Sequence, residues 1–161
     1  MGYQASIENA SAANAVTAAV ANTIEENKTY LVASQVGATT ILDGDCMSWD
    51  LTSYGGAVRT NVIKKSATAT DFVRGVALIP AGSLVIPATT AAGDRFVSVT
   101  VLRRGVKLNC SVSAGAAGNV AIPGAAGVGV GAAVGTSPVS YGLVLAAPAA
   151  NVGPLFVNAQ F

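Results

Sequence analysis

Charge is distributed very unevenly along this chain of 161 residues. Its nine basic and eight acidic residues all lie before Leu108, and the chain has no histidine. Residues 108–161 consist mainly of Ala, Gly, Val, Pro, Asn and Ser, so they lack most side chains that catalyse reactions or bind metals. We expect a surface of this kind to be buried, either in a core or against another protein.

The composition limits the class of protein. Hydrophobic residues make up 52% of the chain and charged residues only 11%, against about 25% charged residues in a typical soluble domain. A net charge of +1 is too small to attract the chain to nucleic acid or to an anionic membrane surface. The length fits one domain, or one domain with an arm.

Local sequence disfavours three further features: a secretory signal, a membrane-spanning helix, and a disulfide or metal site at the cysteines. The amino terminus lacks the basic and apolar regions of a secretory signal and contains Glu8, so we expect synthesis and use in the cytosol. Residues 120–134 are too short to span a membrane as a helix, and Pro123 and four glycines interrupt them. Cys46 and Cys110 lie far apart without metal-ligand spacing, which predicts two buried thiols.

The first 36 residues are expected to form an amino-terminal arm, and residues 37–161 a β-barrel body. Within the arm, Ala12, Val16, Val20 and Ile24 recur every four residues, which favours a short helix over residues 11–26. The alternative is an arm that becomes ordered only when it docks on a neighbour.

From Thr29 onward the pattern is that of an all-β protein. Phe96–Leu102 and Val106–Val112 alternate apolar and polar residues, and Arg103-Arg104-Gly105 between them predicts a three-residue hairpin loop. Further strands are expected over these ranges: Thr29–Val36, Cys46–Leu51, Ala57–Ile63, Phe72–Ile79, Val139–Leu145 and Leu155–Phe161. Short strands at such intervals indicate a small β-barrel or sandwich.

Glycines inside two of these strands predict local distortion. Phe72–Gly82 and Ser140–Gly153 each place a glycine before an apolar triplet and a proline-containing turn. A glycine inside a strand usually marks a bulge or a sharp bend at a barrel corner.

Asp43, Asp45 and Asp50 are the candidates for acid–base chemistry or for an oxygen-ligand cation site. Asp-Gly-Asp is more often a turn, because aspartate bonds its own backbone and glycine accepts positive φ. The chain contains no histidine, GxSxG or phosphate-binding loop. We therefore expect no catalytic activity, no metal site and no cofactor.

Trp49 and Tyr54 are the aromatic candidates for a binding surface. They could stack on a sugar, as in a receptor-binding or carbohydrate-binding module. The simpler interpretation is that the single tryptophan of a small barrel anchors its core or a subunit interface.

Taken in order, five segments resemble a known family. They are Asp43-Gly44-Asp45, the strand Gly75–Leu78, the strand Gly105–Val112, the segment YGLVLAAPA after Ser140, and the closing LFVNAQF. This order is similar to that of the small β-barrel head decoration, or cement, proteins of tailed bacteriophages. The resemblance implies a structural virion protein, made in the host cytoplasm, that trimerises on the outer capsid surface and bridges major capsid protein subunits, with an extended terminal arm.

Two basic pairs gain a candidate role from this resemblance. Lys64-Lys65 and Arg103-Arg104 are expected at strand ends or turns, where they are either solvated tips that protect sheet edges or contacts to acidic capsid residues. Trp49 is the candidate anchor of a subunit interface. The alternative function is a receptor-binding or carbohydrate-binding β module on a virion or cell surface.

Overall fold

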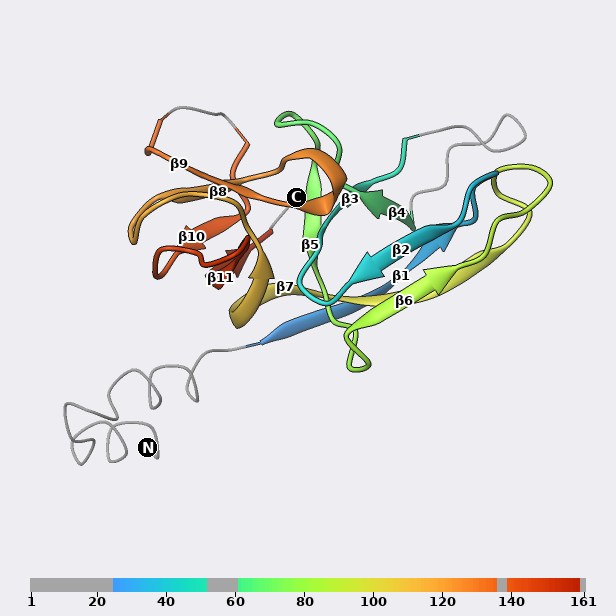
Figure 1. The fold of residues 1–161 in the computed structure, drawn as a ribbon, viewed down its shortest axis with the longest axis horizontal. Helices are drawn as coiled ribbons and strands as arrows, with labels where there is room; N and C mark the ends of the chain where they lie inside the picture. The colour runs from blue at the N-terminus through green and yellow to red at the C-terminus, as the bar shows by residue number, and fades with distance from the viewer. Residues whose placement is uncertain (1–24, 52–60, 136–138, 160–161) are drawn as a thin grey trace.

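The computed structural model describes residues 25–51, 61–135 and 139–159, and these residues are almost entirely β-structure. Five strands form a closed barrel in the order β1-β4-β3-β5-β7, and β7 pairs back onto β1 (Figure 1). Their bounds are β1 Glu26–Ala33, β3 Cys46–Trp49, β4 Val62–Lys65, β5 Val73–Ala77 and β7 Phe96–Ser111. The fold class predicted from the sequence, an all-β barrel or sandwich, is confirmed.

A second group of strands, here called the carboxyl-terminal sheet, extends from the far end of β7. It runs in the order β7-β11-β10-β8-β9 and lies to one side of the barrel in Figure 1, in orange and red. Its strands are β8 Val120–Ile122, β9 Val130–Ala132, β10 Gly142–Val144 and β11 Val152–Asn158, with the 3-10 turn η1 at Ala125–Gly127. A separate two-stranded sheet pairs β2, Thr39–Leu42, with β6, Ser83–Ile86.

The hairpin predicted at Arg103-Arg104-Gly105 is wrong, because β7 is one continuous strand of sixteen residues. Its first half pairs with β1 as far as Arg104, and its second half pairs with β11 from Arg104 onward. Gly105 has a φ of 139°, a value that favours glycine. The glycine therefore marks the point where β7 leaves the barrel for the second sheet, rather than a reversal of the chain.

Two apolar cores meet along β7. The barrel interior is filled from its own strands, with Met47, Ile63 and Val101 fully buried, and from Ile41 of β2 and Ile86 of β6. The second core contains Leu102 and Cys110 of β7 together with residues of the carboxyl-terminal sheet and of β3 and β5. Adjacent residues such as Val101 and Leu102 enter different cores, so β7 is a structural element of both.

The distortion predicted at the internal glycines is confirmed at Gly75 but not at Gly142, where β10 and β11 keep a regular register. Gly75 has a φ of 150°, and a side chain there would collide with the carbonyl of Leu102. Opposite it, the register with β3 shifts between Met47 and Ser48, as expected for a β-bulge. At Gly142 a side chain would collide with the carbonyl of Phe156, so close contact between strands requires glycine there.

The boundary between arm and body was predicted too far along the chain. Residues 26–33 form β1, which pairs with both β4 and β7, so the barrel begins at Glu26 and not at residue 37. The helix expected over residues 11–26 lies almost wholly outside the described residues, and Glu26 itself opens a strand. Within the described ranges no helix has the length and apolar character needed to cross a membrane.

Candidate functional site

The outer face of the carboxyl-terminal sheet carries a row of apolar side chains that crosses all five of its strands. Strand register places these residues side by side: Ala132, Val120, Leu143, Phe156 and Val106. Directly paired residues share a face of a sheet. Leu143 is 38% exposed and the other four are half-buried. We call this set the apolar row.

The face that carries the apolar row has few charged residues: Arg104, two residues before Val106, lies at its border with the barrel. Lys107, the last charged residue of the chain, lies opposite the buried Leu155 and directs its ammonium to Asp43, at 2.7 Å. Leu108 and Leu145, both exposed, continue the alternation of Val106 and Leu143. The uncharged sequence after Lys107 thus contributes most of an outer face on which apolar side chains predominate.

A second surface lies where β3 ends and β5 begins. There a hollow of about 150 Å³ is lined by Trp49, Leu51, Lys64, Thr70, Asp71 and Phe72. Two of these are large apolar residues that are unusually exposed, Leu51 at 63% and Phe72 at 51%. A backbone hydrogen bond from the Trp49 N–H to the Phe72 carbonyl fixes the two segments together, at 3.0 Å. We call this surface the β3–β5 rim.

Trp49 is part of the barrel interior and not an open aromatic platform. Its ring lies edge-to-face with Tyr30 at 5.7 Å between centroids, and the Arg74 guanidinium covers one face at 4.4 Å. Arg74 is only 7% exposed and donates to the Tyr30 hydroxyl from Nη2, at 2.9 Å. This agrees with a core anchor. Tyr54, the other aromatic candidate, lies outside the described residues.

The four basic candidates separate into two kinds. Lys65 contacts Asp45 at 2.9 Å, and Arg103 contacts Glu26 at 2.6 Å. Both side chains are only about a fifth exposed, so they are not the solvated tips that the sequence suggested. Lys64 and Arg104 take part in none of the ion pairs found among the described residues.

The positions of these pairs were predicted with mixed success. Lys64 and Lys65 end β4, as expected, but Arg103 and Arg104 lie in the middle of β7. Arg104 is exposed and lies opposite Asn158 at the border of the carboxyl-terminal sheet.

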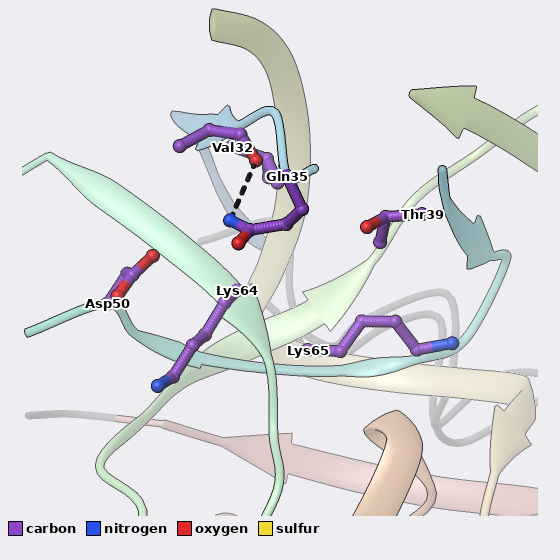
Figure 2. A pocket seen from close by; sticks show the side chains of 7 residues that line it. Val32, Gln35, Thr39, Asp50, Lys64 and Lys65 are labelled. Atoms are coloured by element: carbon purple, nitrogen blue, oxygen red, sulfur yellow. Dashed lines mark hydrogen bonds between the residues drawn. The ribbon is translucent and has the colours of Figure 1, made fainter. Parts of the chain in front are cut away.

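Lys64 and Lys65 also line a second hollow of about 260 Å³, shown in Figure 2. Their side chains extend in opposite directions from β4, with Lys64 toward the side of Asp50 (Figure 2). The Gln35 side-chain amide donates to the Ala33 carbonyl at 3.4 Å and borders the hollow. Lys64 is thus shared by both hollows.

The aspartates form a turn, as the simpler interpretation predicted. Gly44 has a φ of 92°, and the Asp45 N–H bonds back to the Leu42 carbonyl. The Asp45 carboxylate accepts from the Leu42 N–H at 2.8 Å and from the Ser111 hydroxyl at 2.9 Å, beside Lys65. These oxygens are occupied by the fold, and the described residues contain no cluster of ligands suited to a metal ion.

The two cysteines are buried free thiols, as predicted. Burial is the main cause that raises the pKa of Cys46 to about 12 and that of Cys110 to about 12. Burial likewise raises the pKa of the Tyr141 hydroxyl, whose ring lies in the same core. Thiols that remain protonated are poor nucleophiles, so this cluster is suited to packing rather than to catalysis.

Asp71 holds a turn beside the β3–β5 rim. Partial burial acts to raise its pKa, but hydrogen bonds from Ala67 and Thr68, with Lys64 nearby, lower it overall. The carboxylate accepts from the Ala67 N–H at 2.6 Å and from the Thr68 hydroxyl at 2.7 Å. Asp71 is therefore ionised and already committed to its own turn.

Sequence reasoning predicted an uncharged assembly surface but did not identify which residues share the outer face of the sheet. The signal for the apolar row was the absence of charge after Lys107, whereas strand register was needed to place Val120, Leu143 and Phe156 together. The β3–β5 rim was missed, because Phe72 was expected inside a strand.

The chain matches no protein-family model, and no curated protein is significantly similar to it in sequence. The two surfaces described above are therefore the features from which a function can be inferred.

Proposed function

We propose that the protein is a structural virion protein: a capsid decoration, or cement, protein that forms a homotrimer on the outside of a phage head. In this role it would bridge major capsid protein subunits and stabilise the shell. The function requires surfaces for other protein chains and no reaction centre.

The observation that carries the proposal is the apolar row on a sheet face with few charged residues. Homo-oligomer interfaces are about 65% apolar in their cores, and contiguous apolar patches on a protein surface usually mark sites of association. The row runs from Ala132 on β9 to Val106 on β7, and among its strands the charged neighbour on the same face is Arg104, at its β7 end, so a second copy could cover most of the row without desolvating a charge. Contacts between copies at this face are thus physically favourable.

A non-catalytic role is also supported by how the polar groups are used. Asp45 accepts from the Leu42 N–H and pairs with Lys65, and Asp43 accepts from the Ile79 N–H and pairs with Lys107. The buried thiols have raised pKa values. These groups contribute to the fold and are not presented to a substrate.

The proposal is tested by subunit number and by binding to heads. We expect the purified protein to be a trimer by light scattering and to co-sediment with heads assembled from the major capsid protein of the same genome. Leu143→Lys should yield monomers, because it places a charge in the apolar row. Val85→Lys is the matched control, because Val85 is 58% exposed on β6, outside the row.

Two outcomes would contradict the proposal. One is an unchanged protein that is strictly monomeric and never co-sediments with heads. The other is a Leu143→Lys variant that keeps the subunit number of the unchanged protein, which would remove the apolar row from the interface.

A further inference from the structure

A trimer requires each copy to contact its neighbours through two different surfaces. Contacts around a three-fold axis are heterologous, because one patch of a copy meets a different patch of the next, whereas a patch that meets itself produces a two-fold dimer. The apolar row can therefore supply only one side of the contact in the proposed trimer. The other side must be a different part of the chain that is suited to covering a largely apolar face.

Residues 9–24 have the composition that such a cover requires. They contain no Asp, Glu, Lys or Arg, and their apolar residues are Ala, Val and Ile. Burial of these residues on the row would therefore desolvate no charge of the segment. The β3–β5 rim, by contrast, has Lys64 and Asp71 in its lining, and these charges would have to leave water if the rim covered the row. The segment is the better complement for the row.

The described chain begins beside the middle of β7 (Figure 1). A Cβ at Gly105 would lie 3.2 Å from the Glu25 Cγ and 3.2 Å from the Leu102 Cδ1. Gly105 therefore faces the second core, which contains Leu102 and Val157, its partner on β11. Val106, the next residue, points to the opposite face and belongs to the row. The segment before Glu25 thus starts next to the row but on the other side of the sheet.

This starting point favours the row of a neighbouring copy. To cover the row of its own copy, the segment would have to pass around the sheet, whereas the row of a neighbour imposes no such path. Neighbouring strands lie about 4.8 Å apart, so a row across five strands is about 19 Å wide. Sixteen residues span about 24 Å as a helix and more when extended. Residues 9–24 are therefore long enough to cross the row in either conformation.

We infer that residues 9–24 of one copy cover the apolar row of the next copy in the trimer. This inference rests on the proposed function and names the partner of the row. Three such contacts close a ring, because each copy gives its segment to one neighbour and receives a segment from the other. Val16, Val20 and Ile24 supply the larger apolar side chains of the segment, and Leu143 lies at the centre of the row that receives them.

Chemical cross-linking tests where the segment binds. In the double variant Val20→Cys/Leu143→Cys, a bismaleimide reagent should join different chains, so that covalent dimers and trimers are seen on denaturing gels. The native thiols of Cys46 and Cys110 are buried and should not react while the protein is folded. Each single variant should remain uncross-linked. So should Val20→Cys/Val85→Cys, whose second thiol lies on β6, outside the row.

A charge in the segment tests its contribution to the trimer. Val20→Lys should raise the dissociation constant of the trimer by about tenfold or more, because binding to the row would desolvate an unpaired charge. Ser11→Lys, the matched control, adds the same charge at a polar position of the segment and should keep the trimer. Both variants should retain the circular dichroism of the unchanged protein, because the segment precedes the first strand of the barrel.

Four results would overturn the inference. Cross-links found only within single chains would place the segment on the row of its own copy. Cross-links between chains of Leu143→Cys alone would show that two rows meet around a two-fold axis. A trimeric double variant that does not cross-link, or a Val20→Lys trimer as stable as that of Ser11→Lys, would assign the cover of the row to another surface and leave the proposed function standing. If the unchanged protein is monomeric and does not bind heads, the proposed function fails, and this inference with it.

Discussion

The barrel and the carboxyl-terminal sheet share β7, yet charged side chains are distributed very unevenly between their surfaces. The barrel carries Lys64, Lys65 and Arg103 with several carboxylates, and it buries an arginine inside. The sheet has no charged residue after Lys107 and presents the apolar row. The same strand therefore passes from a charged region to one without charge after Lys107, although both regions expose large apolar side chains.

This difference in surface follows from the fact that the barrel is closed and the carboxyl-terminal sheet is open. A closed barrel has no free strand edge between its members, so its outer surface can be polar and fully solvated. The carboxyl-terminal sheet ends at the short strand β9 and has only one face packed on the barrel. Its other face stays apolar, which is useful only if another chain covers it. The fold is determined by the two cores, whereas the association that we propose would use this uncovered face.

The largest effect is expected where the two regions are joined through Asp45. Its carboxylate is 1% exposed and connects β4 through Lys65 to the second half of β7 through Ser111. Asp45→Ala should lower the free energy of unfolding by about 3–5 kcal/mol, because it leaves Lys65 without its buried partner. Urea denaturation measures this loss.

The matched control for Asp45→Ala is Glu26→Gln, which removes the more exposed partner of Arg103. It should cost about 0–1 kcal/mol. An Asp45→Ala variant no less stable than Glu26→Gln would show that the two regions are not coupled through this carboxylate.

The next prediction compares the two cores directly. Ile63→Ala in the barrel and Leu155→Ala in the second core each remove a fully buried side chain. Each should cost about 2–5 kcal/mol. Because β7 belongs to both cores, we expect a single unfolding transition in calorimetry, moved to lower temperature by either change. Two transitions, of which each variant moves only one, would show that the regions unfold independently.

Residue alternation predicted most of the strands but not how they connect. The fold class and the turn at Gly44 followed from local pattern, because period-two alternation and Asp-Gly-Asp have direct backbone causes. Arg103-Arg104-Gly105 has the composition of a hairpin loop, but β1 and β11 pair on both sides of Arg104 and keep β7 extended. Long-range pairing of this kind overrides local turn signals.

The candidate sites were predictable only as far as they depended on composition. The absence of charge indicated an assembly surface, while the apolar row depends on register between strands far apart in the chain. Neither Lys65 nor Arg103 could be recognised as paired, because their partners lie 20 and 77 positions away. Residues 37–161 were expected as the body, yet β1 shows that a segment rich in polar residues can complete a barrel.

The second core, which contains Cys46 and Cys110, should make the stability of the protein sensitive to alkali. Burial holds the thiols of Cys46 and Cys110 protonated up to about pH 12, against 9.0 for an unburied thiol. Between these values the unfolded chain loses protons that the folded chain keeps, so stability falls as pH rises. At pH 10 the loss is about 1 kcal/mol per thiol.

The double variant Cys46→Ala/Cys110→Ala should lose less stability than the unchanged protein between pH 8 and pH 10. Thiol labelling provides an independent measurement, because both thiols should react only after unfolding. Rapid labelling of the folded protein at pH 8 would show that the core is open to solvent.

Sensitivity to acid should arise in the barrel region alone, because residues 108–161 contain no carboxylate side chain. The hydrogen bonds at Asp71 lower its pKa, so its ionised form stabilises the fold at neutral pH, and this contribution disappears as pH falls through the folded pKa. Asp71→Asn keeps one acceptor oxygen and should cost about 1 kcal/mol or less at pH 7. At pH 3 the melting temperatures of the two proteins should converge. An equal difference at both pH values would mean that Asp71 acts by its shape and not by its charge, and acid sensitivity would then have to come from other carboxylates of the barrel.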